Sequence, residues 1–347
     1  MVNLVPGGMG GTETYARELT EQLAAHEGVS VHAFVPRSAA EAPFAVDTSV
    51  LGSIAGAAGT GARLASIAQA AFRRSVSHQV FDQADVVHFP FTVPVPRPVG
   101  RPHVITLHDV QHLDMPQFFP RAERAYRRWA YDRAALRADA VITVSEFCRQ
   151  RVVEVLGVPS HRVHVAHLAV ADGFVPERRE RQEFVLYPSR RWPHKNHRRL
   201  LAAMELVRRE RPTMRLVLTG GGEPLAGAPA WVEQRGLVPR EELSELYRTA
   251  GCMAFPSLYE GFGLPPLEAM ASGCPVAVST AGSLPEICGD AGVSFDPVSV
   301  PDMAAAILVA LEGGERRADL GRERAATFTW RRCAEQHVAV YRTLAQR

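Results

Sequence analysis

The sequence predicts an α/β fold made of two doubly wound, Rossmann-like domains that face a central cleft. The chain has 347 residues, which is about twice the length of an ordinary domain. Short apolar runs alternate with amphipathic helical segments along it, as in parallel sheets covered by helices on both faces. A polar, charged stretch at residues 171–182 contains Pro176 and divides this pattern into halves. We therefore expect domains over residues 1–175 and 176–327, followed by a helix over 328–347.

Six short apolar runs in the first half are predicted to be strands, at residues 2–5, 29–35, 86–89, 104–107, 140–144 and 163–165. Four segments with apolar residues at helical spacing lie between them, at residues 12–25, 62–72, 122–136 and 146–156. The stretch from residue 36 to residue 61 is rich in Ala, Gly and Ser, and its apolar residues follow neither helical nor strand spacing. It is predicted to be a loop.

The second half repeats the alternation. Strands are expected at residues 184–187, 215–218, 253–255, 276–278 and 293–295. Helices are expected at residues 198–207, 241–249, 265–272 and 303–311. Because doubly wound sheets bind ligands at the carboxyl ends of their strands, the loops that follow these strands are where functional residues are expected.

The composition excludes several classes of protein. The formal net charge of +2 gives no overall field for nucleic acid. No run of 18 apolar residues spans a membrane, and the start MVNLVPGG lacks the layout of a signal peptide. That start is also short for a first strand, so we expect the natural start to lie upstream. The cysteines lack metal-ligand spacing, which favours reduced core thiols in a cytoplasmic protein. They are Cys148, Cys252, Cys274, Cys288 and Cys333.

The strongest functional pattern is the segment EGFGLPPLE, residues 260–268, which follows the strand expected at 253–255. Its glycines permit a tight turn, and Pro265 suits the first helical position. The helix start would direct backbone N–H groups and a positive dipole end at an anion. Glu268 lies about one turn inside that helix, where its carboxylate can accept hydrogen bonds from a ribose diol. The alternative is an ordinary strand–turn–helix with two solvated carboxylates.

This segment resembles the retaining glycosyltransferases of family 4, which have the GT-B fold, and within them the mannosyltransferase-like group. Two glutamates with seven residues between them mark that family, and Glu260 and Glu268 match them. The flanking text PSLYEGFGLPPLEAMASGCPVAVS and GSLPEICGDAGVSFDP is also similar. The resemblance covers nearly the whole chain and is dense from residue 184 to residue 345. It implies that the last helix, beginning near Trp330, crosses back onto the N-terminal, acceptor-side domain.

The resemblance also implies a role for each residue of the motif. Glu260 and the main chain of Phe262, Gly263 and Leu264 would hold hydroxyl groups of the donor sugar. Glu268 would hold the ribose.

A second pattern, SRRWPHKN at residues 189–196, follows the strand expected at 184–187. Of the 39 Lys and Arg residues, Lys195 is the only lysine, and the two residue types are not interchangeable at a phosphate. Members of the resembling family grip the donor pyrophosphate with an arginine and a lysine at this spacing, which Arg190 and Lys195 match. Fixed cations there stabilise a departing diphosphate. Ser189 stands where the family often has glycine, and Arg191 is a second candidate. The alternative is a solvated basic helix start.

Two further patterns lie in the first half. GGMGGTET, residues 7–14, is rich in glycine but matches neither the P-loop nor the dinucleotide spacing. By resemblance, Gly10 and Gly11 match paired glycines over the donor phosphates, and a plain strand–helix turn is the alternative. His108 ends the strand at 104–107 and matches a family histidine near the reacting centre, with a core histidine as the alternative. His88, after the preceding strand, is a weaker candidate.

The resemblance places the nucleobase against the main chain of Arg235, Leu237 and Val238. The three glycines at 220–222 permit close approach nearby, although a simple loop accounts for them equally. Residues 121–137 form a basic helix with aromatic residues, which can rest on anionic lipid or be a solvated surface helix.

Together these observations predict a metal-independent transfer of a hexose, with mannose as the first candidate, from a nucleotide diphosphate sugar. No DxD motif ends a strand to hold a divalent cation. The acceptor would be a glycan, a lipid-linked molecule or a small molecule, and the enzyme would be cytoplasmic or peripheral on the inner face of a membrane. The alternatives are a sugar-nucleotide epimerase or a disaccharide phosphorylase on the same scaffold, and a nucleotide-sugar binder without turnover.

Overall fold

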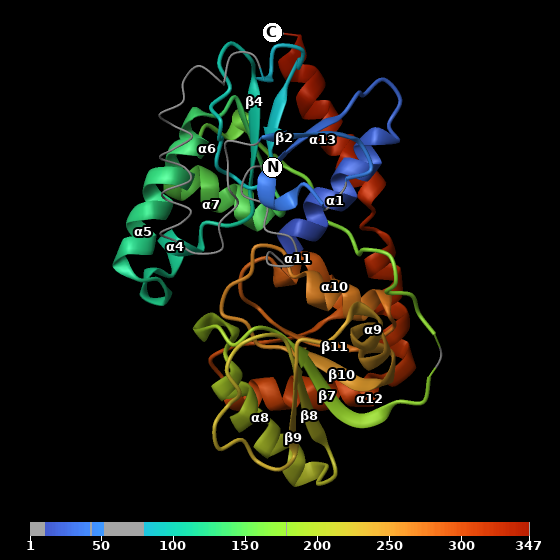
Figure 1. The fold of residues 1–347 in the computed structure, drawn as a ribbon. Coiled ribbons are helices and arrows are strands. Elements are labelled where there is room, and N and C mark those ends of the chain that lie inside the picture. Colours follow the sequence, from blue (N-terminus) through green and yellow to red (C-terminus); the bar gives the residue numbers. More distant parts are fainter. Residues whose placement is uncertain (1–10, 42–43, 52–79, 178, 347) are drawn as a thin grey trace. The chain divides into compact units, whose positions relative to one another are not determined.

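The computed structural model describes residues 11–41, 44–51, 80–177 and 179–346. The chain divides into two compact units, one formed by residues 1–168 with 330–347 and the other by residues 169–329. Each unit holds its own parallel sheet with helices packed on it (Figure 1). These sheets confirm the predicted α/β class. The strand predicted at residues 2–5, the helix at 62–72 and residues 7–10 lie outside the described residues.

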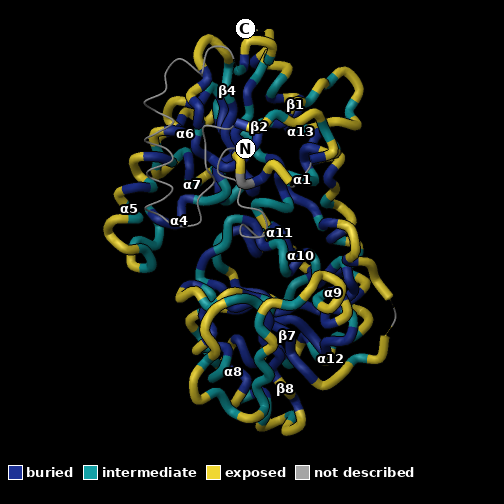
Figure 2. The backbone as a smooth tube through the Cα atoms, in the orientation of Figure 1, coloured by how far each residue is buried: buried dark blue, intermediate teal, exposed yellow. Residues whose placement is uncertain are grey.

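The first unit is built on a four-stranded parallel sheet in the order β3-β4-β5-β6. Its strands are β3 (Val87–Phe89), β4 (His103–Leu107), β5 (Ala140–Thr143) and β6 (Val163–Val165). Most residues of these strands are buried, most completely in β5 and least in β6; β4 is labelled in Figure 2. Their near-continuous apolar sequence fits a sheet covered on both faces, and their positions agree with the predicted ones.

A separate pair of parallel strands joins β1 (His32–Pro36) to β2 (Asp47–Leu51). The prediction of a loop from residue 36 to residue 61 was therefore wrong at residues 47–51. The sequence DTSVL has only one buried residue, Leu51, so it carries no apolar period that would identify it as a strand.

The helices of the first unit include α1 (Gly11–Ala24), α4 (Gln111–Asp114), α5 (Arg121–Arg127), α6 (Arg133–Arg137), α7 (Glu146–Leu156) and α13 (Trp330–Ala345). The π-helical turn η4 (Arg128–Asp132) joins α5 to α6. Helix α7 begins where the Ser145 side chain accepts a hydrogen bond from the Cys148 N–H, and it ends at Gly157 in the left-handed region.

Helix α13 packs against α1 and is tied to the sheet by a buried chain of hydrogen bonds. The His337 Nδ1 lies 2.7 Å from the Cys333 carbonyl, which can only accept, so Nδ1 donates and Nε2 accepts from the Tyr15 hydroxyl at 2.8 Å. The Tyr15 oxygen then accepts from Thr106 at 2.7 Å, and Thr106 accepts from His88 Nε2 at 2.8 Å. These directions hold when His337 is neutral, and burial favours the neutral form of both histidines because it lowers the pKa of each.

This arrangement predicts an acid-sensitive fold. Burial lowers the pKa of His337 from 6.5 to about 4. Above pH 6.5 the histidine is neutral in both states; between pH 6.5 and about 4 only the unfolded chain binds the proton, so stability falls as the pH falls. The loss contributed by His337 is roughly 3 kcal/mol at its full extent. Unfolding by urea between pH 7.5 and pH 4.5 should show it. His337→Gln, which keeps an acceptor for Tyr15, should have a shallower pH dependence, and an equal slope in both proteins would contradict the assignment.

The second unit contains a six-stranded parallel sheet in the order β12-β11-β10-β7-β8-β9. Its strands are β7 (Gln182–Pro188), β8 (Arg215–Thr219), β9 (Val232–Gly236), β10 (Ala250–Phe255), β11 (Val276–Ser279) and β12 (Val293–Phe295). Five of these were predicted. β9 was missed because its sequence, VEQRG, is polar and none of its residues is buried, as suits an edge strand.

The helices of the second unit are α8 (His197–Glu210), α9 (Arg240–Thr249), α10 (Leu264–Ala271), α11 (Leu284–Cys288) and α12 (Val300–Ala326). Helix α12 contacts both α8 and α10 and extends well beyond the predicted 303–311, with a kink at Gly314. All five cysteines of the chain lie in the described ranges, and each is a buried thiol, as predicted.

Candidate functional site

The predicted donor-binding residues gather where the second unit's sheet reverses its winding. Strand β7 has β8 on one side and β10 on the other. After β7 the chain adds β8 and β9 on one side of it. It then returns to the other side of β7 and adds β10, β11 and β12 there. The adjacent ends of β7 and β10 therefore form a topological switch point. Hydrogen bonds join the two loops that follow: the Leu258 N–H donates to the His194 carbonyl at 2.8 Å, and the Asn196 amide donates to the Pro256 carbonyl at 3.0 Å.

Backbone hydrogen bonds hold the loop after β7 in place, and the Arg191 side chain adds two further hydrogen bonds to it. The Ser189 N–H donates to the Thr219 carbonyl at 2.9 Å. A Cβ on Gly220 would lie 2.6 Å from the Ser189 carbonyl group, so only glycine permits this approach. The Arg191 guanidinium donates to Gly222 at 3.0 Å and to Gln234 at 2.8 Å. It therefore stabilises the loop.

Arg190, in contrast, extends from the loop into solvent. Its guanidinium carbon lies 5.6 Å from the Trp192 ring centre, and it makes no ion pair within the described ranges. An unpaired guanidinium on a fixed backbone is suited to binding an anion.

Lys195 and Glu260 form an ion pair across the two loops. The Lys195 Nζ lies 2.5 Å from Glu260 Oε1, and each side chain is only 13% exposed. The Nζ also lies 5.3 Å from the centre of the Phe255 ring, and the Tyr187 hydroxyl fixes the lysine backbone by donating to its carbonyl at 2.6 Å. The ammonium group is thus preorganised, with one carboxylate nearby and hydrogens left for a second acceptor.

The Glu260 backbone is fixed by residues to which sequence analysis gave no role. Ser283 donates to the Glu260 carbonyl through its N–H at 3.1 Å, and its hydroxyl donates to the Phe262 carbonyl at 2.7 Å and lies 3.2 Å from the Glu260 carbonyl. A Cβ on Gly282 would come within 2.4 Å of the same carbonyl oxygen. Both residues lie in the segment GSLPE, which is part of the sequence that resembles the family. That resemblance was the only sequence feature that could have indicated them.

Helix α10 begins beside this pair with few backbone donors. Gly263 caps it in the left-handed region, at φ 104°. Pro265 and Pro266 have no N–H groups, and the Leu267 N–H is already bonded to the Gly263 carbonyl at 3.3 Å. The donors left at the helix start are the amides of Gly263 and Leu264, which have no partner in the part of the chain that the structure describes. Of the backbone N–H groups expected to face an anion at this helix start, these two are therefore the ones that remain available.

Glu268 lies half-buried on α10 and accepts a hydrogen bond from the Tyr247 hydroxyl at 3.1 Å. Burial raises the pKa of Glu268 to about 7, although Tyr247 and the charge of Arg240 oppose this effect. Tyr247 is fully buried on α9, and sequence analysis did not single it out. Its inward position on an amphipathic helix was the only indication.

The predicted nucleobase segment follows β9. Arg235 pairs with Glu233 at 2.6 Å and Glu242 at 3.2 Å, so its side chain is occupied at the surface. Leu237 is 75% exposed and faces Gly221, and the Gly220 N–H donates to the Gly236 carbonyl at 2.7 Å. Residues 236–238 therefore lie beside the loop after β8, with their main chain near the surface.

The candidates in the first unit are described within that unit alone. His108 follows β4; its Nε2 lies 3.1 Å from the Pro90 carbonyl, its ring packs edge-on against Tyr15, and burial lowers its pKa. His88 is hydrogen-bonded at both ring nitrogens, to Thr106 and to Tyr341, so both of its polar atoms have partners inside the first unit. Gly11 is the first residue of α1, and Gly10 lies outside the described residues.

The described ranges contain neither a helix able to cross a membrane nor a cluster of three His, Cys, Asp or Glu side chains placed to hold a metal ion.

Two family models together match nearly the whole chain. "Glycosyltransferase Family 4" matches residues 9–174, and "Glycosyl transferases group 1" matches residues 172–326. The O-antigen chain mannosyltransferase B of Escherichia coli is 32% identical over 267 residues, which cover 70% of each chain. The MMP alpha-(1->4)-mannosyltransferase of Mycolicibacterium hassiacum is 33% identical over 238 residues, 62% of this chain and 58% of the relative.

Solved structures with low sequence identity share the fold. Sucrose-phosphate synthase from Thermosynechococcus elongatus superposes with a TM-score of 0.77 at 22% identity, covering 96% of this chain and 94% of its own. WaaG, a glycosyltransferase involved in lipopolysaccharide biosynthesis, gives a TM-score of 0.72 at 17% identity and 96% coverage of both chains. At these identities the likeness shows the fold, which is GT-B.

Proposed function

Because the chain belongs to glycosyltransferase family 4 and is a retaining glycosyltransferase, we propose that it transfers a hexose, with mannose as the first candidate, from a nucleotide diphosphate sugar without a metal ion. The mannosyltransferases among its relatives support the choice of sugar. The acceptor is a hydroxyl group on a glycan, a lipid-linked molecule or a small molecule.

The observation that carries this proposal is the Lys195–Glu260 pair beside the start of α10. The pair joins the loops after β7 and β10 at the switch point, where a doubly wound sheet binds ligands. A partly buried ammonium, the exposed Arg190 and the amides of Gly263 and Leu264 supply the donors that a diphosphate needs. Glu260 orients the ammonium and offers its second oxygen to a sugar hydroxyl.

In the proposed reaction, the bond from the sugar anomeric carbon to the diphosphate breaks as that carbon bonds to the acceptor oxygen on the same face. The diphosphate gains charge as it departs, and Lys195 and Arg190 stabilise it. The departing phosphate oxygen takes the acceptor proton, so the products are the glycoside and the nucleoside diphosphate. We assign His108 to a hydrogen bond with a hydroxyl group near the reacting carbon.

A screen of GDP-, UDP- and dTDP-sugars by thermal stabilisation identifies the donor, since a ligand that binds only the folded state raises the melting temperature. The preferred donor should then be consumed with an acceptor equally fast in EDTA and in added Mg²⁺. A strict requirement for Mg²⁺ or Mn²⁺ would contradict the metal-free mechanism. Donor conversion without acceptor would favour an epimerase, dependence on inorganic phosphate a phosphorylase, and binding without turnover a non-catalytic binder.

Glu268 is proposed to hold the ribose, and Glu268→Gln tests that role. We expect roughly a 10- to 100-fold loss of nucleoside diphosphate affinity, the range for a hydrogen bond to a charged group. Because the pKa of Glu268 is about 7, the unmodified protein should also bind more weakly as the pH falls below 7, when the carboxyl group is protonated. Titration calorimetry at pH 8 and pH 6 measures both effects. Glu205→Gln, on the exposed face of α8, is the matched control, and equal affinities for both variants would exclude the assignment.

A further inference from the structure

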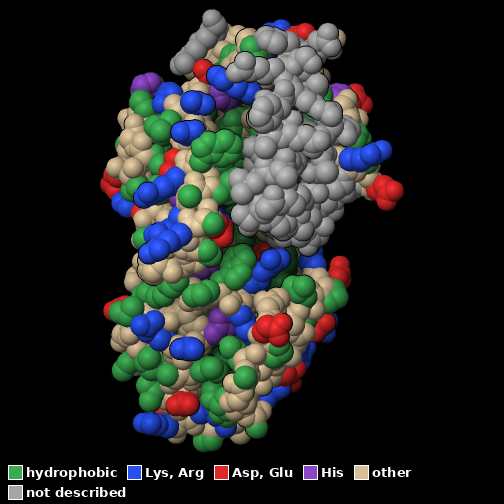
Figure 3. Space-filling view, turned by 60° about the vertical axis from the view of Figure 1, so that its left-hand side comes forward, with side chains coloured by type: hydrophobic (Ala, Val, Ile, Leu, Met, Phe, Trp, Pro, Cys, Tyr) green, Lys and Arg blue, Asp and Glu red, His purple; other side chains and the backbone are tan. Residues whose placement is uncertain are grey.

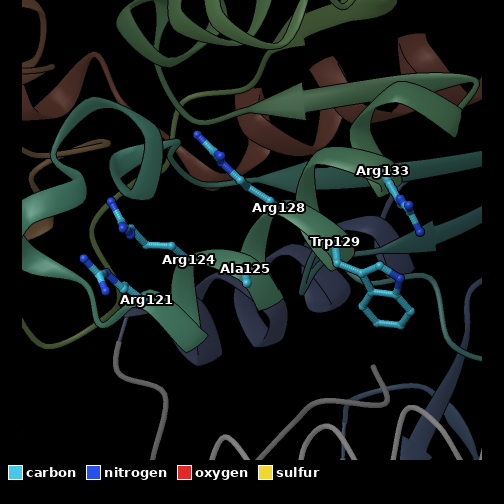
Figure 4. Close-up of a pocket in the computed structure, with 6 residues that line it drawn as sticks. All are labelled: Arg121, Arg124, Ala125, Arg128, Trp129 and Arg133. Atoms are coloured by element: carbon cyan, nitrogen blue, oxygen red, sulfur yellow. The ribbon is translucent and has the colours of Figure 1, made fainter.

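Two parts of the first unit concentrate polar side chains outside the residues proposed to hold the diphosphate. The first is the surface of α5, η4 and α6, where basic and apolar side chains lie next to each other (Figure 3). A pocket of about 480 Å³ there is lined by Arg121, Arg124, Ala125, Arg128, Trp129 and Arg133 (Figure 4). Its arginines extend away from the segment, and within the described ranges they hydrogen-bond to none of the residues assigned above. The second is the end of β4, where buried polar groups lie around His108.

The loop after β3 contacts the end of β4 twice. The Thr92 N–H donates to the Phe89 carbonyl at 3.3 Å and closes a turn. The Thr92 hydroxyl donates to the Thr106 carbonyl at 2.7 Å. The His108 Nε2 lies 3.1 Å from the Pro90 carbonyl. Because β3 pairs with β4, these two side-chain contacts continue the connection between the two chain segments past the end of β3 and as far as His108.

Thr92 makes its contact from an unfavourable backbone conformation. Its φ is 69°, in the left-handed region where a β-branched residue is rare. Among the described residues other than glycine, only Asn196 also has a positive φ, and asparagine tolerates this region better. Such a conformation persists only where the surroundings fix it, often at a functional site. Glycine would form this turn without strain but would supply no hydroxyl, so the hydroxyl is the property of threonine that the structure uses here.

The contact with Pro90 fixes the tautomer of His108. A carbonyl oxygen can only accept, so Nε2 donates to it, and in the neutral ring Nδ1 then carries the lone pair. Burial lowers the pKa of His108, against the opposing effects of the Pro90 hydrogen bond and of Asp109. The Tyr15 ring packs edge-on at 5.2 Å, and the Cys148 thiol donates to the His108 carbonyl at 3.2 Å. The ring is therefore held on several sides, while Nδ1 has no hydrogen-bond partner within the described ranges.

We propose that Thr92 is a positioning residue for His108, and that the loop after β3 presents the bare Nδ1 of this histidine to a sugar hydroxyl, which donates to it. The proposal rests on the transferase function proposed above and specifies the atom and the direction of the hydrogen bond. A hydroxyl that donates to Nδ1 keeps more electron density on its oxygen. That density favours the positive charge that develops on the sugar as the diphosphate departs, whereas a protonated Nδ1 would oppose it.

Nitrogen NMR of the ligand-free protein with ¹⁵N-labelled histidine tests the tautomer without any transfer reaction. We expect the His108 signal, identified by its absence in His108→Ala, to show a protonated Nε2 and a bare Nδ1 at pH 7.5. Thr92→Val, which keeps the shape of the side chain but lacks the hydroxyl, should shift this signal. Thr20→Val is the matched control and should leave it unchanged, because the buried Thr20 hydroxyl also donates to a backbone carbonyl, that of Ala16 at 2.6 Å.

The kinetic test compares the same variants in sugar transfer. Thr92→Val should lower kcat roughly 10- to 100-fold, the scale of a small misplacement of a group at the reacting centre. The donor KM should change little, because the residues proposed to contact the diphosphate lie in the second unit. Thr92→Ser keeps the hydroxyl and should retain most of the turnover, and Thr20→Val should retain all of it. In the His108→Ala background, Thr92→Val should cause no further loss, since its effect acts through the imidazole.

Three results would overturn the proposal. The first is a proton on Nδ1 of His108 in the unmodified protein. The second is equal turnover in Thr92→Val and Thr92→Ser, which would mean that the hydroxyl has no role. The third is the same loss from Thr92→Val with and without His108, which would indicate only a structural role. If thermal unfolding shows that Thr92→Val does not fold, Thr92→Gly replaces it, because glycine adopts this backbone and also lacks the hydroxyl. A protein that shows the expected tautomer and its response to Thr92→Val but transfers no sugar would contradict the transferase function and not the positioning of His108.

Discussion

Replacing Lys195 with alanine is expected to reduce sugar transfer by roughly 10²- to 10³-fold, the usual effect of removing one preorganised donor from a developing anion. The ammonium group is held between Glu260 and the Phe255 ring, so it needs little rearrangement when the diphosphate departs. The loss should fall mainly on kcat, because the interaction strengthens as negative charge develops. Initial rates with saturating donor and acceptor measure it.

Arg198→Ala is the matched control for Lys195→Ala. Arg198 lies in the first turn of α8, is exposed and makes no ion pair within the described ranges, so its loss should leave turnover unchanged. Unchanged turnover in Lys195→Ala, in a protein with normal thermal unfolding, would remove the diphosphate assignment.

Glu260→Ala is expected to cause a loss of similar size, roughly 10²-fold or more, through two effects. The carboxylate no longer contacts a donor hydroxyl, and Lys195 loses the partner at 2.5 Å that orients its ammonium group. Since the two side chains form one unit, the double variant should be little worse than either single variant. A double-mutant cycle on kcat measures this coupling.

The controls for Glu260 separate its charge from its backbone. Glu260→Gln keeps the size of the side chain and should retain part of the loop geometry while losing the ion pair. Gly282→Ala keeps the carboxylate group but brings a Cβ against the Glu260 carbonyl, so it should reduce turnover by displacing the loop that positions this carboxylate. Additive effects of Lys195→Ala and Glu260→Ala would show that the ion pair does not act as a unit.

The buried strands of both sheets were predictable because parallel strands between helices are apolar on both faces. The positions of Arg190, Lys195 and Glu260 at strand ends followed from the same pattern. β2 and β9 were not predictable in this way, since an edge strand such as VEQRG buries nothing that a period would reveal. The proximity of Lys195 and Glu260, 65 residues apart, depends on the strand order, which places β7 next to β10.

Other features of the site depend on side-chain pairing that no short pattern encodes. Arg191 stabilises the loop because its guanidinium group donates to the Gly222 carbonyl and to the Gln234 side chain. Arg190 has no such partners within the described ranges and extends into solvent. The small number of free amides at the start of α10, those of Gly263 and Leu264, could have been predicted from the sequence, because Pro265 and Pro266 have no N–H groups. The π-helical turn in residues 128–132 has no local sequence marker.

The hydrogen-bond chain from His88 to His337 affects how the protein folds during synthesis. Residues 169–329 leave the ribosome as a complete unit, whereas the first unit needs Trp330–Ala345 to supply the acceptor for Tyr15. The unit that is translated first is therefore the last to acquire its full set of contacts. Until residues 330–345 have been translated, the hydroxyl of Tyr15 and the side of α1 that contacts α13 stay accessible to water and to chaperones.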